Sequence, residues 1–437
     1  MGPFRFVHIA DVHLDTAFAA RRDDVRRRLR EAAREAFRRA VDLTLRSGAH
    51  ALLIAGDLFD QDRISFATER FLAEELARLR DRGISVCYAC GNHDPGGFRD
   101  RTGDVDWSDV IVFADPEPSP HLIRTPSGEP VAWVSGAGHR HAREGDNLVA
   151  SFARLAGRLH GDDTGPLPHV AVVHAWVHSA AGGDAHDRYA PCTPRDLHMA
   201  GRSAGIAYWA LGHVHERQEI PGEPPAHYPG SLMGRHFRET GAKGAYVVEV
   251  DRRGDVRLTF HPLAPVRWET VRLTDLADLF TPSELEQQIE AACRRIQARE
   301  DHRGDWLWRI ELAGPCPLAD RLEQDENREE LEIRLQEALE ALHVEVRLAG
   351  LTRVVDPSRY RDGVHPLAVA LDLLERAGRD DGLLDELAPP VLAGEQDDPA
   401  LASDPARRRE YLRELLAGLD REATARLLDP ERGPDGR

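Results

Sequence analysis

The chain has 437 residues, with 57 lysines and arginines against 75 aspartates and glutamates, so its formal net charge is −18. This length is too great for one ordinary domain and suits two or three. No run of 18 apolar residues occurs, which argues against a transmembrane helix and a membrane partner. Five scattered cysteines do not predict a disulfide framework. The first residues read as a strand and not as a signal peptide, so a cytoplasmic location is expected.

The acidic balance counts against a nucleic-acid partner, because DNA affinity comes mainly from lysine and arginine meeting phosphates. The basic residues are nearly all arginine, and Lys243 is the only lysine. Arginine suits bidentate contacts with phosphate. Net charge describes the whole chain and not one face of it. The composition therefore leaves a DNA substrate open.

In chain order, the first part of the sequence alternates short apolar runs with amphipathic stretches. This pattern predicts a sheet flanked by helices. Strands are expected over residues 4–10, 51–55 and 84–88, and helices over 21–46 and 66–82.

From about residue 106 the apolar runs lie closer together, which predicts a second sheet made mostly of hairpin-like units. The expected strands are 110–113, 131–134, 170–173, 208–211, 245–250 and 256–260. Residues 1–263 are therefore interpreted as one catalytic domain, which Pro262 and Pro265 separate from the rest.

Two smaller regions follow. Residues 264–360 alternate strands (267–273, 306–313, 344–348) with helices (282–299, 329–342), which predicts a small α+β domain. Residues 361–437 predict helices over 366–377 and 406–428, separated by a Pro- and Asp-rich spacer at 388–404. The leucines of the last helix could fit a partner's groove or pack within the chain; they are Leu412, Leu415, Leu416 and Leu419.

Five polar motifs follow predicted strands in the first 215 residues. They are Asp11-x-His13, Gly56-Asp57-x-x-Asp60, Gly91-Asn92-His93-Asp94, His174 and Gly212-His213-x-His215. Each motif alone is weak, but in such sheets ligands collect at the carboxyl ends of strands. A mixed carboxylate, amide and imidazole set without cysteine favours Mn or Fe over structural zinc. The ordered set therefore predicts a metal site.

This set of motifs resembles the calcineurin-like metallophosphoesterase superfamily. Residues 9–15 and 55–60 resemble its DNA repair exonuclease branch, which includes the SbcD nuclease, and residues 228–244 resemble YhaO-type members. The resemblance implies an α/β/β/α sandwich with a small α+β capping, DNA-binding domain and a helical C-terminal tail.

The resemblance also implies roles for individual residues and two divalent ions, Mn first, with Fe, Mg or Zn as alternatives. One ion is assigned Asp11, His13, Asp57 and His215, and the other Asp57, Asn92, His174 and His213. His93 matches the catalytic histidine, and Asp60 is expected to orient it through a hydrogen bond. The implied reaction is phosphodiester hydrolysis, with His93 stabilising or protonating the leaving oxygen.

The favoured function is a Mn-dependent DNA exonuclease or endonuclease in DNA repair. The resemblance implies an SbcC-like SMC-type ATPase partner and a homodimer, and Arg235 and His236 are candidates for contacting DNA. The alternative is a phosphatase or phosphodiesterase acting on a nucleotide or another small phosphoester, since both chemistries use the same motifs. A scaffold without activity is a third reading, against which the intact ligand set argues.

Overall fold

The computed structural model of the chain describes residues 2–18, 21–60, 64–103, 105–160, 167–178, 189–354, 366–391, 405–416, 419–420 and 423. Contacts between residues divide the chain into two compact units. The first contains Met1–Thr270, Glu300–Arg309 and Glu340–His343, and the second contains Val271–Arg299, Ile310–Leu339 and Val344–Arg437. The three-part division at residues 263 and 360 stays a prediction.

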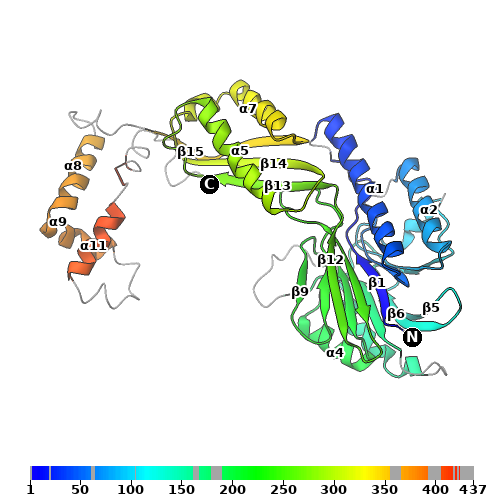
Figure 1. Cartoon of the computed structure of the whole chain (residues 1–437). Helices are drawn as coiled ribbons and strands as arrows, with labels where there is room; N and C mark the ends of the chain where they lie inside the picture. Colours follow the sequence, from blue (N-terminus) through cyan, green and yellow to red (C-terminus); the bar gives the residue numbers. More distant parts are fainter. Residues whose placement is uncertain are drawn as a thin grey trace. The chain divides into compact units, whose positions relative to one another are not determined.

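Six strands form the first sheet, in the order β12-β11-β1-β2-β3-β4. They are β1 (Phe4–Ile9), β2 (Ala51–Ala55), β3 (Ser85–Ala89), β4 (Val110–Phe113), β11 (Gly244–Val250) and β12 (Val256–Pro262). Strands β1 to β4 are parallel, whereas β11 is antiparallel to both β1 and β12. Helices α1 (Asp23–Arg46) and α2 (Phe66–Arg80) connect the first parallel strands, as the sequence predicts (Figure 1).

The side chains of β1 point alternately to the two faces of this sheet, and each face packs against a different part of the core. Val7 and Ile9 belong to the core cluster that includes the buried stripe of α1, while Phe4 and Phe6 belong to a different cluster on the other face. Successive side chains of a strand point to opposite faces, so one strand serves two cores.

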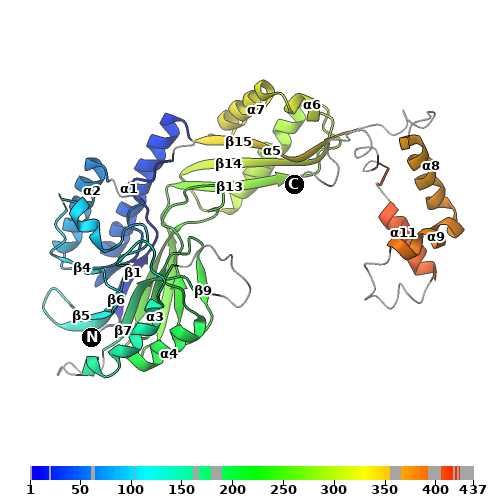
Figure 2. The same ribbon diagram turned by 180° about the vertical axis from the view of Figure 1, so that it is seen from behind.

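The second sheet has the order β5-β6-β7-β8-β10-β9. Its strands are β5 (Ser119–Arg124), β6 (Pro130–Ala137), β7 (His169–His174), β8 (Tyr208–Gly212), β9 (Gln218–Ile220) and β10 (Ala226–Tyr228). The prediction of hairpin-like units is wrong here, because β6, β7 and β8 are parallel. Long connections containing α3 (Leu148–Ser151) and α4 (Pro194–Ala204) allow these strands to run parallel (Figure 2). Strands β4, β11 and β12 belong to the first sheet instead.

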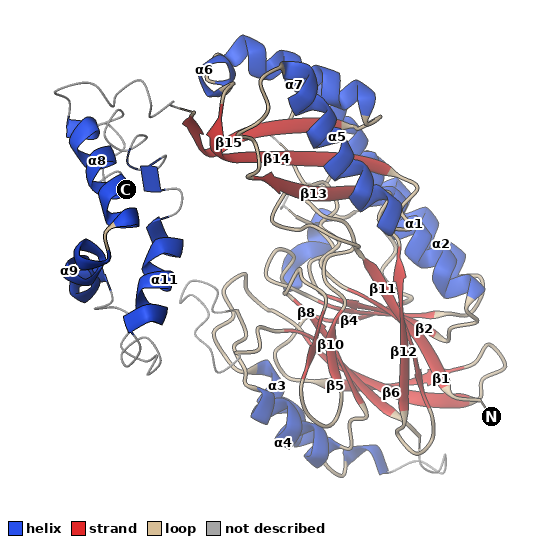
Figure 3. Ribbon diagram, turned by 60° about the vertical axis from the view of Figure 1, so that its left-hand side comes forward, coloured by secondary structure: helices blue, strands red, loops and turns tan. Residues whose placement is uncertain are grey.

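The two sheets pack face to face around one shared core. This core includes Phe6 and Leu53 from the first sheet and Val172, Tyr208 and Ala210 from the second. Helices α3 and α4 pack on the outer face of the second sheet. Figure 3 shows the strands of both sheets together with helices outside them. The α/β/β/α sandwich expected from the sequence is therefore confirmed.

Helix α4 was not predicted, although its ends carry clear signals. The Thr193 side chain accepts a hydrogen bond from the Asp196 N–H, and the Asp196 side chain accepts one from the Thr193 N–H, which makes a capping box. Pro194 opens the helix, and Gly205 closes it with a left-handed φ of 69°. These cap residues would have located the helix.

A third sheet has the order β13-β14-β15. Its strands are β13 (Val266–Leu273), β14 (Asp305–Cys316) and β15 (His343–Arg353), and its helices are α5 (Pro282–Arg299), α6 (Ala319–Leu322) and α7 (Asp325–Ala338). Helix α5 has the predicted bounds and buries Leu285, Ile289 and Ala292. The alternation of strands and helices predicted for this region is confirmed.

The C-terminal region contains α8 (Pro366–Arg379), α9 (Asp381–Val391) and α11 (Pro405–Leu416). The predicted spacer is wrong at its start, because residues 388–391 belong to α9; its remainder lies outside the described residues. Leu412 is buried and clusters with Leu384 and Leu416, whereas Leu415 is exposed. Among the helices that are described, none is both long and apolar enough to cross a bilayer.

Candidate metal centre

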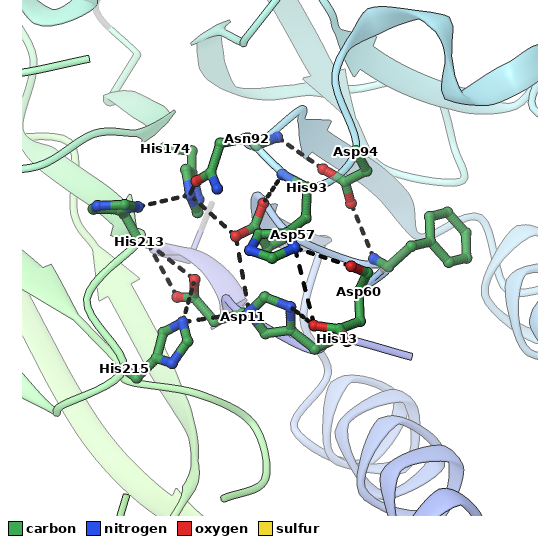
Figure 4. Close-up of polar contacts among 12 residues, drawn as sticks. Asp11, His13, Asp57, Asp60, Asn92, His93, Asp94, His174, His213 and His215 are labelled. Carbon is green, nitrogen blue, oxygen red and sulfur yellow. Dashed lines mark hydrogen bonds and ion pairs between the residues drawn. The ribbon is translucent and has the colours of Figure 1, made fainter. Parts of the chain in front are cut away.

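The five motifs converge where parallel strands of both sheets end. Asp11 follows β1, Asp57 follows β2 and Asn92 follows β3, while His174 ends β7 and His213 follows β8. Nδ1 of His174 donates to the carbonyl oxygen of Ala55 at 2.9 Å, so a hydrogen bond ties the second sheet to the first. Figure 4 shows the side chains pointing toward one another from these strand ends.

Strained backbone marks the same residues. Asp11, His13 and Asp57 each have a φ of 49°, and His213 has a φ of 106°. Non-glycine residues rarely adopt these left-handed values, and such strain gathers at functional sites. Backbone hydrogen bonds hold the strained turns, with the Asp11 N–H on Gly56 O at 3.2 Å and the His13 N–H on Asp57 O at 2.9 Å.

Two glycines of the motifs are required by close packing. A Cβ at Gly56, whose φ is +87°, would lie 2.1 Å from Nδ1 of His174. A Cβ at Gly91 would lie 2.1 Å from Oδ1 of Asp57. Any side chain at either position would displace a candidate ligand, which explains why glycine precedes the acidic and amide residues here.

Asp11, His13 and His215 form the first group of potential ligands, with one donor atom from each lying within 4.8 Å of the others. Nε2 of His13 lies 3.3 Å from Nε2 of His215, which in turn lies 3.5 Å from Oδ1 of Asp11. Burial is the main cause that lowers the pKa of His13 to about 3. His13 is therefore neutral near pH 7, which is the form that binds metals.

Asp57 lies between this group and a second one. Its Oδ2 is 3.8 Å from Nε2 of His13 and 3.4 Å from Nε2 of His174. Oδ1 of Asn92 lies 3.0 Å from Nε2 of His174, and Nδ1 of His213 lies 3.3 Å from the same nitrogen. Burial is the main cause that lowers the pKa of His213 to about 3. A carboxylate in this position can bridge two ions.

The sequence pattern of the calcineurin-like phosphoesterase family matches residues 4–217. An uncharacterised metallophosphoesterase of Bacillus subtilis, YhaO, is 31% identical over 299 residues, which are 67% of this chain and 68% of that protein. The chain belongs to the calcineurin-like phosphoesterase family. The resemblance inferred from the motifs is confirmed.

Two further relatives of this calcineurin-like phosphoesterase have names that mention DNA repair or a nuclease. The DNA double-strand break repair protein Mre11 of Methanopyrus kandleri is 30% identical over 278 residues, covering 59% of this chain and 56% of that protein. A subunit of the SbcCD nuclease of Escherichia coli is 26% identical over 275 residues, covering 56% of this chain and 64% of that relative. The chain thus spans less than two thirds of either relative.

The carboxylate, amide and imidazole donors of this site fit the divalent metal ions that membership of the calcineurin-like phosphoesterase family suggests. Asp11 and Asp57 are buried carboxylates, and burial of an ionised carboxylate needs a compensating positive charge. Burial has lowered the pKa of His13 and His213, whose imidazoles therefore supply little of that charge. His215, whose pKa is raised, offsets only part of the charge on Asp11. Bound cations would supply the remaining positive charge. Oxygen and imidazole donors together suit Mn, Fe or Zn, and the chain itself does not choose among them.

Asp60, the second acidic residue of the Gly-Asp-x-x-Asp motif, makes different contacts from those that the sequence predicts. Nδ1 of His93 donates to the backbone carbonyl of Asp60 at 2.9 Å, while the Asp60 carboxylate lies 3.9 Å from that nitrogen. The carboxylate instead lies 3.1 Å from Nδ1 of His13 and accepts from Nη1 of Arg235 at 2.6 Å. The expected orientation of His93 by this carboxylate is therefore corrected: the main chain makes that contact.

His93 lies at the open side of the centre, with 38% of its side chain exposed. Its backbone N–H donates to Oδ1 of Asp57 at 2.9 Å, and its ring meets the ring of His13 edge-on. One of its ring nitrogens is also close enough to His13 and Asp57 to join them as a ligand. Its assignment as a catalytic residue and not a ligand stays a prediction.

Asp94, the last residue of the Gly-Asn-His-Asp motif, is buried and connects two loops by hydrogen bonds. Its two carboxylate oxygens accept hydrogen bonds from the N–H groups of Gly91 and Phe59, at 2.9 and 3.0 Å. Burial, followed by the charge of Asp57, raises the pKa of Asp94. Asp94 thus joins the loop after β2 to the loop after β3.

Glu239 is a site residue that the motifs did not reveal. It is 6% exposed, and its Oε1 lies 2.7 Å from Nδ1 of His215. Oε2 accepts a hydrogen bond from the backbone N–H of Arg235 at 2.9 Å. Burial would lower the pKa of His215, but hydrogen bonds to Asp11 and Glu239 raise it to about 9. The Arg235 and His236 residues predicted to contact DNA lie beside Glu239, and that role stays a prediction.

Two further buried histidines near the centre have structural partners. His8 lies 3.2 Å from the Tyr208 hydroxyl and from Leu211 O, and Nε2 of His139 donates to His174 O at 2.9 Å. Both are therefore buried histidines held by contacts with neighbouring residues.

Proposed function

We propose that this chain is a metal-dependent phosphodiesterase that hydrolyses DNA with two divalent ions, of which Mn²⁺ is the first candidate. The observation that carries the proposal is the position of Asp57, whose Oδ2 lies within 3.8 Å of His13 on one side and 3.4 Å of His174 on the other. One carboxylate between two imidazole groups is the arrangement expected of a binuclear centre. Family membership supports hydrolysis of a phosphoester.

In this proposal, Asp11, His13 and His215 hold one ion, Asn92, His174 and His213 hold the other, and Asp57 bridges them. When bound, the two ions supply the charge that activates a water molecule and neutralises the phosphate oxygens. The chain supplies rigidity, because strained turns and buried hydrogen bonds fix each donor before substrate arrives. Little covalent chemistry is left for protein side chains.

His93 is the proposed proton donor to the leaving oxygen. The Asp60 carbonyl accepts the proton of its Nδ1 at 2.9 Å, which leaves Nε2 for the substrate. The exposed position of the ring makes that nitrogen accessible. An imidazole suits this task near neutral pH.

The choice of DNA as substrate rests on relatives named as a DNA double-strand break repair protein and as part of a nuclease. We extend the proposal to an SbcC-like SMC-type ATPase partner, a homodimer, a cytoplasmic location and a DNA contact by exposed His236. The net charge of −18 favours a small phosphoester instead. That alternative is an outcome of the test below.

The test compares substrates for the full chain purified with Mn²⁺. Labelled double- and single-stranded DNA are offered in one series, and para-nitrophenyl phosphate with its bis-ester in the other. Asp57→Ala is the inactive control. DNA degradation that disappears in the control supports the proposal. Hydrolysis of small esters with DNA intact, even after addition of an SMC-type ATPase, would favour the small-molecule phosphodiesterase.

A further inference from the structure

Two of the candidate ligand histidines are each backed by a carboxylate, and one arginine joins the two carboxylates. We propose that Arg235 and Glu239, together with Asp60, are positioning residues that aim His13 and His215 at one shared metal ion. The inference rests on the binuclear centre of the proposed function and assigns a task to residues outside the ligand set.

On the His215 side, Glu239 sets the direction of the imidazole. Its Oε1 lies 2.7 Å from Nδ1, so this nitrogen carries a proton, and Nε2 lies 3.5 Å from Oδ1 of Asp11, where a bound ion would take the place of the second proton of the ring. The other oxygen of Glu239 accepts a hydrogen bond from the backbone N–H of Arg235 at 2.9 Å. A ligand histidine with its second nitrogen on a carboxylate has its tautomer and ring orientation fixed.

On the His13 side, the carboxylate of Asp60 lies beside the imidazole as a close polar contact that lacks hydrogen-bond geometry. Its Oδ1 lies 3.1 Å from Nδ1 of His13, and Nε2 of that ring lies 3.3 Å from Nε2 of His215. Both imidazoles thus present Nε2 to one point while Nδ1 rests on an acidic group. Figure 4 shows the Asp60 contact and the neighbouring rings of His13 and His215.

Arg235 ties the two carboxylates to each other. Nη1 donates to Asp60 at 2.6 Å, and Nε lies 3.6 Å from Glu239. A planar guanidinium can contact two carboxylates in a fixed geometry, which a lysine ammonium cannot do. Its side chain is 18% exposed, so it is largely enclosed by these partners. These contacts leave the side chain better suited to holding the centre than to meeting DNA.

The same segment also holds the main chain of His215. Lys243, the only lysine of the chain, is buried and donates from Nζ to the His215 carbonyl oxygen at 2.7 Å. Residues 235–243 therefore restrain both the ring and the backbone of this ligand. No comparable restraint on His174 or His213 comes from this segment among the described contacts.

The test measures Mn²⁺ binding to metal-stripped full-length protein by calorimetry, without any substrate. The variants are Arg235→Met and Glu239→Ala, and Arg238→Met is the matched control, because Arg238 is exposed and lies next to Glu239 in the sequence. Each variant is expected to weaken one of the two Mn²⁺ sites by roughly 10–100-fold and to leave the other unchanged. The control should bind both ions like the wild type.

Wild-type affinity at both sites in folded Arg235→Met and Glu239→Ala would overturn the inference. So would equal weakening of both sites, because the effect would then not be local to His13 and His215. If Glu239→Ala fails to fold, Glu239→Leu, which keeps most of the volume but offers no acceptor to Nδ1 of His215, decides the question. Because DNA is absent, a wild type that binds two ions but cleaves no DNA would refute the proposed substrate without touching this inference.

Discussion

The Nε2 atoms of His13 and His215 lie 3.3 Å apart, with the two rings edge-on at 66°, although the residues follow strands of different sheets. Each ring reaches this position only when the two sheets are packed together. The donor cluster therefore does not exist in the unfolded chain, and binding of metal adds directly to folding free energy.

Mn²⁺ should accordingly stabilise the protein. At a free concentration 100 times the dissociation constant, one site raises the free energy of unfolding by about 2.7 kcal/mol. Thermal unfolding with and without Mn²⁺ measures this effect. Asp57→Ala, which removes the candidate bridge, should lose most of the increase; an unchanged increase would contradict the bridging role.

His93→Ala should separate chemistry from metal binding. We expect turnover to fall by roughly 10²–10⁴-fold, because a proton donor is lost. Metal content should stay near that of the wild type, since the ring rests on a main-chain carbonyl at the open side of the centre. Metal analysis after dialysis checks this. Loss of an ion together with turnover would show that His93 is a ligand.

Gly91→Ala should disturb the centre through packing alone. The added Cβ would lie 2.1 Å from Oδ1 and 2.7 Å from N of Asp57, and overpacking of this kind costs about 1–3 kcal/mol. Urea unfolding should show that loss, and Mn²⁺ affinity should fall as Asp57 moves. The matched control is Gly97→Ala, where a Cβ meets no heavy atom within 4 Å. Equal behaviour of the two variants would refute the argument.

His169 should make the fold less stable in mild acid. Burial is the main cause that lowers its pKa to about 4 from 6.5, while its ring lies 2.7 Å from Ser135 Oγ and 3.0 Å from Ala204 O. Between pH 6.5 and about pH 4 the unfolded chain binds one proton more at this histidine than the folded chain does. The free energy of unfolding therefore falls as the pH drops, by up to about 1.4 kcal/mol per pH unit.

Urea unfolding of metal-free protein between pH 5 and pH 7.5 measures this dependence. His169→Gln should make the slope smaller by the contribution of one proton, because one titrating group is gone, while buried His13 and His213 still contribute. His141→Gln replaces an exposed histidine and should leave the dependence as in the wild type. A slope that His169→Gln does not change would assign the acid sensitivity to other groups.

Local sequence patterns predicted the elements that local forces determine. Strand β2 and helix α5 were located to the residue, and the candidate ligands meet because the carboxyl ends of parallel strands share one edge. The strand order of the second sheet was not predictable in this way, because hydrophobic runs do not report which strands pair. Helix α4 was missed although its capping box was visible.

The supporting residues of the centre lay beyond sequence reasoning for a different reason. Glu239 follows His215 by 24 positions, and only tertiary packing brings its carboxylate to Nδ1. The Asp60 carboxylate turns toward His13 and Arg235, a choice that spacing within its motif does not encode. The spacing of polar residues after each strand predicts the candidate metal ligands. The groups that orient these ligands come from distant segments of the chain.

The most direct test of the central claim is a crystal structure of the full chain grown with Mn²⁺, with anomalous scattering measured at the manganese edge. The account predicts two anomalous peaks, one among Asp11, His13 and His215, the other beside His174 and Asn92, with Asp57 contacting both. A single peak, or two peaks without a shared Asp57, would contradict the binuclear centre.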